Sequence, residues 1–353
     1  MVRVLIVDDS AAVRRFVAQE LGKDPEIEIV GSAPDAFVAR EFILSTNPDV
    51  LTLDLEMPRM DGLTFLRKIM RHRPLPVVVF SSLTPRGGAK ALEALAAGAV
   101  DVVCKPATPA LADSVTRDLA VRVKLAAKAS LVRSAVSREA PTTVTARGHG
   151  RILAFGASTG GTVALESILT KLRPGDSRVL IVQHMPEVFT KSFSMRLRRV
   201  CGLDVREAQH GDLLEPGEVL VAPGNHHLVL RFAAGVYTVD VLAGPTVNGH
   251  RPSIDVMFSS VAEAAPRTSV AVLLTGMGRD GAQGLLKIRQ AGGRTLAQDE
   301  ASSVVFGMPR AAVEIDAAEH VTGLDDIPAQ LVKLLDGDHG LPKAQAHTDA
   351  EVI

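Results

Sequence analysis

The stretch RILAFGASTGGTVALESIL, residues 151–169, joins an apolar run, a glycine-rich turn and a helical pattern. The run is continuous enough for a strand buried on both faces, and the apolar residues after the turn repeat at helical spacing. A strand, a glycine turn and a helix in this order form the repeating unit of doubly wound α/β sheets. Two chemistries use this unit, because the turn can cradle a nucleotide phosphate or expose a serine nucleophile.

The glycine spacing at this turn favours the serine. A dinucleotide-binding turn has the pattern G-x-G-x-x-G, whose middle glycine leaves room for the pyrophosphate. Ser158 occupies that middle position, and the next strand ends in Gln183 and His184 rather than in an acidic residue for a ribose. The same residues fit G-x-S-x-G, in which the serine lies on a strand-to-helix turn. We therefore predict that Ser158 is a nucleophile.

A base and an acid are available for this serine. His184 ends the apolar run RVLIVQHM, so it is expected at the same edge of the sheet as Ser158. Asp280, in the loop of LLTGMGRDG, would set the tautomer of His184, and the N–H of Met277 could bind an oxyanion. Taken singly, Ser158 and Asp280 could cap helices and His184 could be an ordinary strand-end residue. Their joint occurrence favours a catalytic triad.

The first third of the chain predicts another parallel sheet with helices on both faces. Short apolar runs alternate there with amphipathic patterns, as in α/β folds. Strands are expected at 3–9, 26–33, 49–55, 76–82 and 100–106, and helices near 11–22, 35–46, 62–72 and 86–97.

Polar residues follow the strands of this sheet at its carboxyl edge, where open parallel sheets bind ligands. Asp8 and Asp9 follow the first strand, Asp54 the third, Ser81 ends the fourth, and Lys105 follows the fifth. Three carboxylates brought together favour a hard divalent cation with oxygen ligands. Asp8 and Asp9 alone could simply cap the following helix, but Asp54 and Lys105 make a binding pocket the better interpretation.

This constellation resembles the receiver domain of bacterial response regulators over roughly residues 1–125. The resemblance implies that Asp54 accepts a phosphoryl group from a histidine kinase. It also implies that Ser81 and Lys105 respond to that group. The Mg²⁺ ligands that it implies are Asp9, Asp54, the backbone carbonyl of Glu56, and Asp8 either directly or through a water.

The motifs GASTGG, QHMP and TGMGRDG together resemble the chemotaxis protein-glutamate methylesterase family, here with a receiver domain attached. The resemblance covers nearly the whole chain and has serine, histidine and aspartate in the family's order. It implies hydrolysis of glutamate γ-methyl esters on the cytoplasmic helices of methyl-accepting chemotaxis receptors, and deamidation of receptor glutamines. Ser158 would attack, His184 would move the proton, Asp280 would orient His184, and Thr159 would contact His184 or the substrate. The unphosphorylated receiver is expected to cover the active site, and phosphorylation of Asp54 to uncover it.

The predicted architecture is α/β with two domains. A flavodoxin-like receiver with a five-stranded parallel sheet is expected at 1–125, followed by a linker at 126–150 that is rich in Ser, Thr, Ala, Arg and Gly. A Rossmann-like, doubly wound and mostly parallel catalytic domain is expected at 151–337. Residues 226–244 read as an antiparallel hairpin on that sheet, with His226 and His227 as turn or surface residues. Residues 338–353 are expected to be a flexible tail.

Composition argues against several other functions. A formal net charge of -1, one tyrosine and no tryptophan argue against a nucleic-acid partner. Cys104 and Cys201 are too far apart for a disulfide framework or a zinc motif. No apolar run is long enough to span a bilayer and no signal peptide is evident, which favours a cytoplasmic protein without membrane insertion. Mg²⁺ at the receiver is the one cofactor expected, and the ester chemistry needs none.

Three alternatives compete with the methylesterase prediction. An ordinary α/β-hydrolase could pair Ser158 with a late histidine such as His320. The second domain could instead be a catalytically silent scaffold. A DNA-binding output domain is less favoured, because no helix-turn-helix pattern is evident after residue 150. The segment NGHRPSID, which contains His250, could contact substrate, but it stays outside the predicted triad.

Overall fold

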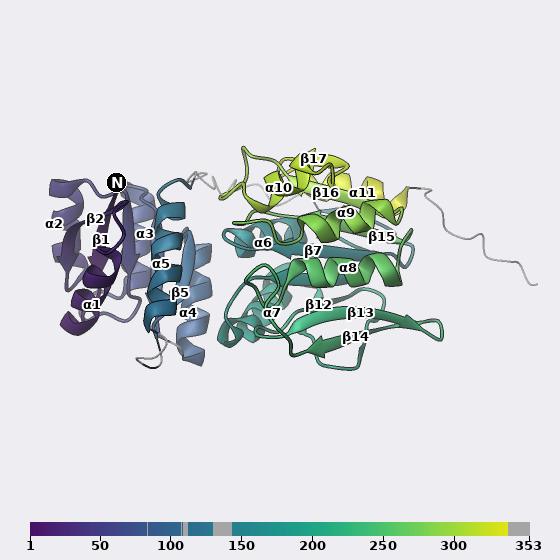
Figure 1. The fold of residues 1–353 in the computed structure, drawn as a ribbon, viewed down its shortest axis with the longest axis horizontal. Coiled ribbons are helices and arrows are strands. Elements are labelled where there is room, and N and C mark those ends of the chain that lie inside the picture. Colours follow the sequence, from purple (N-terminus) through teal and green to yellow (C-terminus); the bar gives the residue numbers. More distant parts are fainter. Residues whose placement is uncertain (83, 107, 109–111, 130–142, 338–353) are drawn as a thin grey trace, which may run out of the picture.

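A computed structural model describes residues 1–82, 84–106, 108, 112–129 and 143–337 of this chain, and it shows two α/β units side by side (Figure 1). Most of the predicted linker and the predicted tail at 338–353 lie outside the described residues. No helix in the part of the chain that the structure describes is both long and apolar enough to cross a membrane.

The N-terminal unit is a five-stranded parallel sheet in the order β2-β1-β3-β4-β5. This is the flavodoxin-like order, with its switch point between β1 and β3. The strands are β1 (Val2–Val7), β2 (Ile27–Ala33), β3 (Val50–Leu53), β4 (Val77–Ser81) and β5 (Asp101–Cys104). The helices are α1 (Ala11–Leu21), α2 (Ala36–Thr46), α3 (Gly62–His72), α4 (Pro85–Ala96) and α5 (Ala112–Ala126).

Both faces of this sheet are buried. Val4 and Ile6 of β1 join an apolar cluster with residues of α1 and α5. Leu5 and Val7, which point to the other face, join residues of α2, α3 and α4. Burial on both faces explains why the strand sequences are continuously apolar rather than alternating.

The C-terminal unit is a seven-stranded sheet in the order β10-β12-β9-β7-β15-β16-β17, and its strand pairs are parallel. Without the edge strand β10, this is the Rossmann order, with the switch point between β7 and β15. The strands are β7 (Ile152–Ala157), β9 (Arg178–Gln183), β10 (Asp204–Glu207), β12 (Glu218–Val221), β15 (Ser269–Leu273), β16 (Arg294–Gln298) and β17 (His320–Thr322).

Helices cover both faces of this second sheet. Residues of α6 (Gly161–Lys171), α7 (Glu187–Cys201) and α11 (Ile327–Asp336) cluster with Leu153 and Phe155 of β7. Residues of α8 (Ile254–Ala264), α9 (Ala282–Gln290) and α10 (Met308–Glu314) cluster with Ile152 and Ala154 on the opposite face. The strand therefore buries alternate side chains in two separate cores.

The predicted hairpin forms a sheet of its own rather than extending the main one. Strands β13 (His227–Ala233) and β14 (Val236–Leu242) pair antiparallel, and β11 (Asp212–Leu213) adds to β14. Figure 1 shows β13 running beside α8, and the Ser260 hydroxyl of α8 accepts a hydrogen bond from Leu230 N. A further short pair joins β6 (Val144–Thr145), within the predicted linker, to β8 (Leu172–Arg173).

The two units meet where α4 of the first contacts α6 and α7 of the second (Figure 1). Leu92 of α4 and Phe189 of α7 belong to one continuous apolar cluster that includes residues of both units. A Cβ placed on Gly88 would lie 3.1 Å from the Phe189 ring, so α4 fits closely against α7. This contact brings the first unit next to the carboxyl edge of the second sheet.

Candidate active site

The turn after β7 presents Ser158 at the switch point of the second sheet. Gly160 has a φ of 79°, a left-handed conformation that glycine adopts without strain. A Cβ on Gly161 would lie 2.3 Å from Oε1 of Gln183, so α6 can start here only with a glycine. Gln183 in turn donates from Nε2 to the Ser158 carbonyl at 2.8 Å and to the His184 carbonyl at 3.1 Å. Gln183, which had no predicted role, therefore links the ends of β7 and β9.

His184 and Asp280 form a hydrogen-bonded pair beside this turn. His184 Nε2 lies 2.9 Å from Asp280 Oδ2, and the side chains are 5% and 0% exposed. A carboxylate only accepts hydrogen bonds, so Nε2 carries the hydrogen and Nδ1 keeps a lone pair. The Nδ1 atom is buried and has no hydrogen-bond partner among the described residues. The imidazole is therefore in the tautomer that can take a proton at Nδ1.

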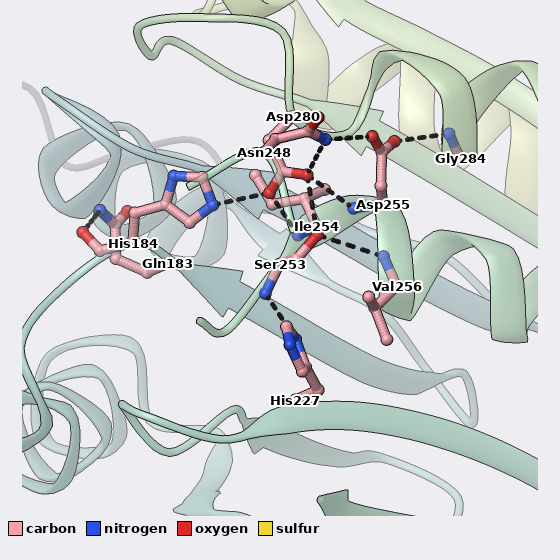
Figure 2. A network of polar contacts seen from close by, with 10 residues as sticks. All are labelled: Gln183, His184, His227, Asn248, Ser253, Ile254, Asp255, Val256, Asp280 and Gly284. Atoms are coloured by element: carbon pink, nitrogen blue, oxygen red, sulfur yellow. Dashed lines mark hydrogen bonds and ion pairs between the residues drawn. The ribbon is translucent and has the colours of Figure 1, made fainter. Parts of the chain in front are cut away.

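Asp280 is held by several donors besides His184 (Figure 2). The hydroxyl of Ser253 donates to its Oδ1 at 2.8 Å, and the N–H of Ile254 donates to Oδ2 at 2.7 Å. Asn248 Nδ2 donates to Oδ1 at 2.9 Å and also reaches Asp255. Burial disfavours the charge of this carboxylate, but the hydrogen bond and charge of His184 and the other donors outweigh it and lower the pKa of Asp280. The acid is fixed in position and ionised.

The donors that hold Asp280 were not predicted from the sequence, and the predicted exposure of His227 is wrong. His227 is buried in β13 rather than exposed in a turn. Its Nδ1 accepts from Ser253 N at 3.2 Å, and its Nε2 donates to the Pro245 carbonyl at 2.9 Å. His227 is buried because both of its ring nitrogens form hydrogen bonds inside the protein, one of them with Ser253 at the start of α8.

Thr159 and Met277, predicted to support the oxyanion or the substrate, lie in different surroundings. Thr159 donates from Oγ1 to Asp101 Oδ2 at 2.6 Å, and Asp101 belongs to β5 of the first unit. Arg122 of α5 also reaches this oxygen at 2.6 Å. Met277 lies in the loop after β15 and is 41% exposed. Within the described part of the chain, its N–H has no hydrogen-bond acceptor.

The space in front of Ser158 is nearly closed by the first unit. A cavity of about 30 Å³ is lined by Ser158, His184 and Phe189 from one unit and by Leu92, Asp101 and Arg122 from the other. One water molecule needs roughly 10–15 Å³ of such volume, so the cavity has room for water but not for a glutamyl ester side chain.

The predicted acidic cluster of the first unit is assembled at its switch point. Asp8, Asp9 and Asp54 each place a carboxylate oxygen within 4.8 Å of the others. Lys105 Nζ lies 2.7 Å from Asp54 and 2.8 Å from Asp8. Burial raises the pKa of Asp54, and the neighbouring Asp8 adds to the shift. Such a cluster of hard oxygen donors, with repulsion left between its members, fits a divalent cation.

Ser81 and Glu56 lie beside this cluster. The Ser81 hydroxyl is buried and has no hydrogen-bond partner in the described residues. Glu56 donates its backbone N–H to Asp54 Oδ1 at 3.3 Å, and its Oε1 lies 3.8 Å from Nζ of Lys90 in α4. Burial opposes the charge of Lys105, but its hydrogen bonds to Asp54 and Asp8 raise the pKa of this ammonium. Lys105 therefore stays charged.

His320, the base of the alternative hydrolase prediction, lies on the edge strand β17. Strands β15 and β16 separate it from β7, and its Nε2 lies 3.9 Å from Glu319 Oε1. His184, not His320, lines the cavity with Ser158.

Two family models match the chain. The model described as CheB methylesterase matches residues 153–331, and the model described as response regulator receiver domain matches residues 4–115. A protein of Anaeromyxobacter dehalogenans (strain 2CP-C), named protein-glutamate methylesterase/protein-glutamine glutaminase 4, is 56% identical over 337 residues, which is 94% of this chain and 95% of that protein. In Pseudomonas aeruginosa, protein-glutamate methylesterase/protein-glutamine glutaminase 2 is 50% identical over 94% of this chain and 96% of that protein.

A solved structure resembles the second unit. The crystal structure of the Thermotoga maritima CheB methylesterase catalytic domain has a TM-score of 0.51 and 38% sequence identity. The match covers 52% of this chain and 98% of the Thermotoga maritima chain.

Proposed function

The chain belongs to the CheB methylesterase family, in the form that carries a receiver domain, and we propose that it hydrolyses glutamate γ-methyl esters on chemoreceptor cytoplasmic helices. The observation that carries this proposal is the pair of His184 and Asp280 beside Ser158, with His184 Nδ1 left free to act as a base. The names of the relatives, protein-glutamate methylesterase/protein-glutamine glutaminase, support the esterase activity and add deamidation of protein glutamines.

Acylation begins with Ser158. Its Oγ attacks the γ-carbonyl carbon of the ester while His184 Nδ1 takes the hydroxyl proton. Asp280 accepts from Nε2 and stabilises the imidazolium that forms. The N–H groups of Thr159 and Met277 are the proposed donors to the oxyanion. When the tetrahedral intermediate collapses, the C–O bond to the methoxy group breaks and His184 returns its proton to methanol.

Deacylation repeats these steps with water. His184 Nδ1 takes a proton from the water that attacks the acyl carbon, and it then protonates Ser158 Oγ as the acyl–serine bond breaks. The products are free glutamate and the regenerated serine. A glutamine substrate would follow the same course, with ammonia leaving in place of methanol.

We propose that Asp54 is the phosphorylation site and that a histidine kinase of a chemotaxis array is the donor. The Asp54 carboxylate would attack the phosphorus of a phosphohistidine, whose P–N bond breaks. Asp8, Asp9, Asp54 and the Glu56 carbonyl are the proposed Mg²⁺ ligands, and the cation would offset charge on the phosphoryl oxygens. Lys105 and Ser81 would then bind those oxygens, because one is charged and the other has an uncommitted hydroxyl.

Phosphorylation is proposed to activate the esterase by releasing the receiver from the active site. The small cavity in front of Ser158 and the Thr159–Asp101 hydrogen bond support this proposal, because the cavity is too small for a glutamyl ester until the first unit moves away. Strand β5 offers a route, since Asp101 starts the strand and Lys105 follows its last residue. A shift of Lys105 toward a phosphoryl group would act on the strand that holds Thr159.

The proposal also includes the bounds of the domains and the place where the protein acts. The receiver is assigned to 1–125, the linker to 126–150, the catalytic domain to 151–337 and the tail to 338–353. The proposed site of action is the cytoplasm, because both the kinase and the receptor helices that carry the methyl esters are there.

The decisive test is methanol release from methylated receptor cytoplasmic fragments. Wild type, Ser158→Ala and Asp54→Ala would be compared with and without a small acyl phosphate and Mg²⁺. We expect release by wild type, none by Ser158→Ala, and stimulation by the acyl phosphate only when Asp54 is present. Methanol release by Ser158→Ala at the wild-type rate would contradict the triad. Phosphorylation of Asp54 without any methanol release would point to a scaffold or to another ester.

A further inference from the structure

The rings of His184 and His250 are stacked. Their centroids are 3.8 Å apart and their planes differ by 6°. The two residues come from separate segments, one at the end of β9 and one in the loop before α8. From this contact we propose that His250 is a positioning residue: its ring holds the imidazole of His184 in the plane in which Nε2 meets Asp280 and Nδ1 stays free for Ser158. The inference rests on the esterase function proposed above.

The loop that carries His250 is tightly built. Val247 and His250 exchange two backbone hydrogen bonds of 3.0 and 2.9 Å. Between them, Asn248 and Gly249 have φ values of 51° and 79°, the positive pair typical of type I′ turns. Asn248 donates to Asp280 from the tip of this turn. One short turn therefore holds the acid through Asn248 and contacts the base through His250.

The stack supplies a restraint that the Asp280 hydrogen bond lacks. A single hydrogen bond at Nε2 leaves the imidazole free to swing about the line from Nε2 to Asp280 Oδ2. A flat ring against its face prevents that swing, which would otherwise carry Nδ1 away from the serine. A misplacement of about 1 Å in such a group can cost roughly a hundred-fold in rate.

His250 can stay next to a base that becomes positively charged. Burial, together with the charge of His184, lowers the pKa of His250 to about 4, while the carboxylate of Asp280 acts in the opposite direction. At neutral pH, His250 is therefore a neutral ring that cannot compete for the serine proton. An imidazolium on the face of a neutral aromatic ring is stabilised rather than repelled.

A metal site is a poorer explanation of the same cluster. His184, His250 and Asp280 have ligand atoms within 4.8 Å of one another. However, Asp280 Oδ2 and His184 Nε2 already form a hydrogen bond with each other. The rings of His184 and His250 are also nearly parallel, so the lone pairs of their nitrogens lie in two separate planes. Tetrahedral coordination needs lone pairs that converge on one point.

The test compares His250→Phe, which keeps a flat ring, with His250→Leu, which fills the space without one. His210→Leu serves as the matched control, because His210 is an exposed histidine of the same unit and lies away from the site, 3.7 Å from Asp240. All are full-length proteins, assayed with a small acyl phosphate and Mg²⁺. The readouts are kcat and KM for methanol release, the rate at which a serine-directed organophosphorus reagent labels Ser158, and thermal unfolding.

We expect His250→Leu to lower kcat and the labelling rate at least about ten-fold with KM changed less than about two-fold. His250→Phe should recover both to within about three-fold of wild type, and His210→Leu should match wild type. Equal kcat values for His250→Leu and wild type would overturn the proposal. So would a folded His250→Phe as slow as His250→Leu, because a ring face would then not be what His184 needs. If wild type labels at Ser158 but releases no methanol, the esterase proposal fails while the labelling rates still decide the role of His250.

Discussion

The hydroxyl of Thr159, next to Ser158, donates a 2.6 Å hydrogen bond to the carboxylate of Asp101 in the receiver. Arg122 lies 2.6 Å from the same carboxylate oxygen. The ion pair of Asp101 and Arg122 in the receiver therefore contacts Thr159 in the catalytic turn. Asp101 is buried, and hydrogen bonds to buried charged groups are stronger than neutral ones, at about 1.5–3 kcal/mol. The contact is therefore strong enough to affect the docking of the receiver.

Asp101→Asn should raise methanol release by the unphosphorylated enzyme. The substitution keeps the shape of the side chain but removes the charge that pairs with Arg122 and accepts from Thr159. A loss of about 1.4 kcal/mol of docking energy corresponds to about ten-fold more of the open state. The measurement is the basal rate without acyl phosphate. Asp118→Asn is the control, because Asp118 also pairs with Arg122 but is exposed and on the same helix. Equal basal rates for Asp101→Asn and wild type would contradict this role.

Asp280→Asn should lower kcat by roughly 10³–10⁴-fold, as in other triads that lose their acid. An amide can present an N–H to His184 Nε2, which favours the wrong tautomer. Asp255→Asn is the matched control, since Asp255 also accepts from Asn248 but does not contact His184.

Asp280 should also stabilise the fold. Its pKa is lowered on folding, so its contribution is present above the ordinary aspartate pKa and is lost as the pH falls below about 4. Urea unfolding should show the gap between wild type and variant narrowing there.

Mg²⁺ should raise the Tm of wild type more than that of Asp54→Asn, because binding to the folded state alone is stabilising. Without Mg²⁺, Asp54→Asn should be the more stable protein. The pKa of Asp54 is raised on folding, so the stabilisation it gives is present at low pH and is lost as pH rises through the folded-state value. At neutral pH its carboxylate therefore opposes folding. Thermal unfolding with and without Mg²⁺ checks both expectations, with Asp204→Asn as an exposed control. The same Mg²⁺ shift in both proteins would place the cation elsewhere.

Gln183→Leu should reduce kcat/KM about ten-fold without unfolding the protein. It removes the two hydrogen bonds that tie the Ser158 carbonyl to the His184 carbonyl and so loosens the spacing of nucleophile and base. Gln290→Leu, at the exposed end of α9, controls for the change of residue type. Wild-type kinetics in Gln183→Leu would show that the two strand ends are held by the backbone alone.

Much of the fold could be predicted from the sequence, because its strands are buried on both faces and its helices are amphipathic. The helix expected near 62–72 is found as α3 at Gly62–His72, where Asp61 caps the first turn. The elements after residue 291, β16, β17, α10 and α11, were not predicted. β17 has three residues and α10 has seven, so each is shorter than the window over which an apolar repeat can be recognised.

The candidate site also has residues that the sequence predicts and residues that it does not. Ser158, His184 and Asp280 follow parallel strands, so their sequence positions alone place them at one edge. The partners of Asp280 come from the loop and helix start at 248–254, which has no strand pattern to indicate where it lies. Likewise, nothing in the sequence near Asp101 shows that it meets Thr159, since that contact depends on how the two domains dock.

Strand β5 connects the contact with Thr159 to the site around Asp54, because Asp101 starts the strand and Lys105 follows its last residue. Coupling between two events on one protein is reciprocal. If a phosphoryl group on Asp54 weakens the hydrogen bond between Thr159 and Asp101, then that hydrogen bond must lower the equilibrium constant for phosphorylation of Asp54 by the same factor. At equilibrium with a given phosphodonor, the docked enzyme would therefore carry less phosphoryl group on Asp54 than a receiver free of the catalytic domain.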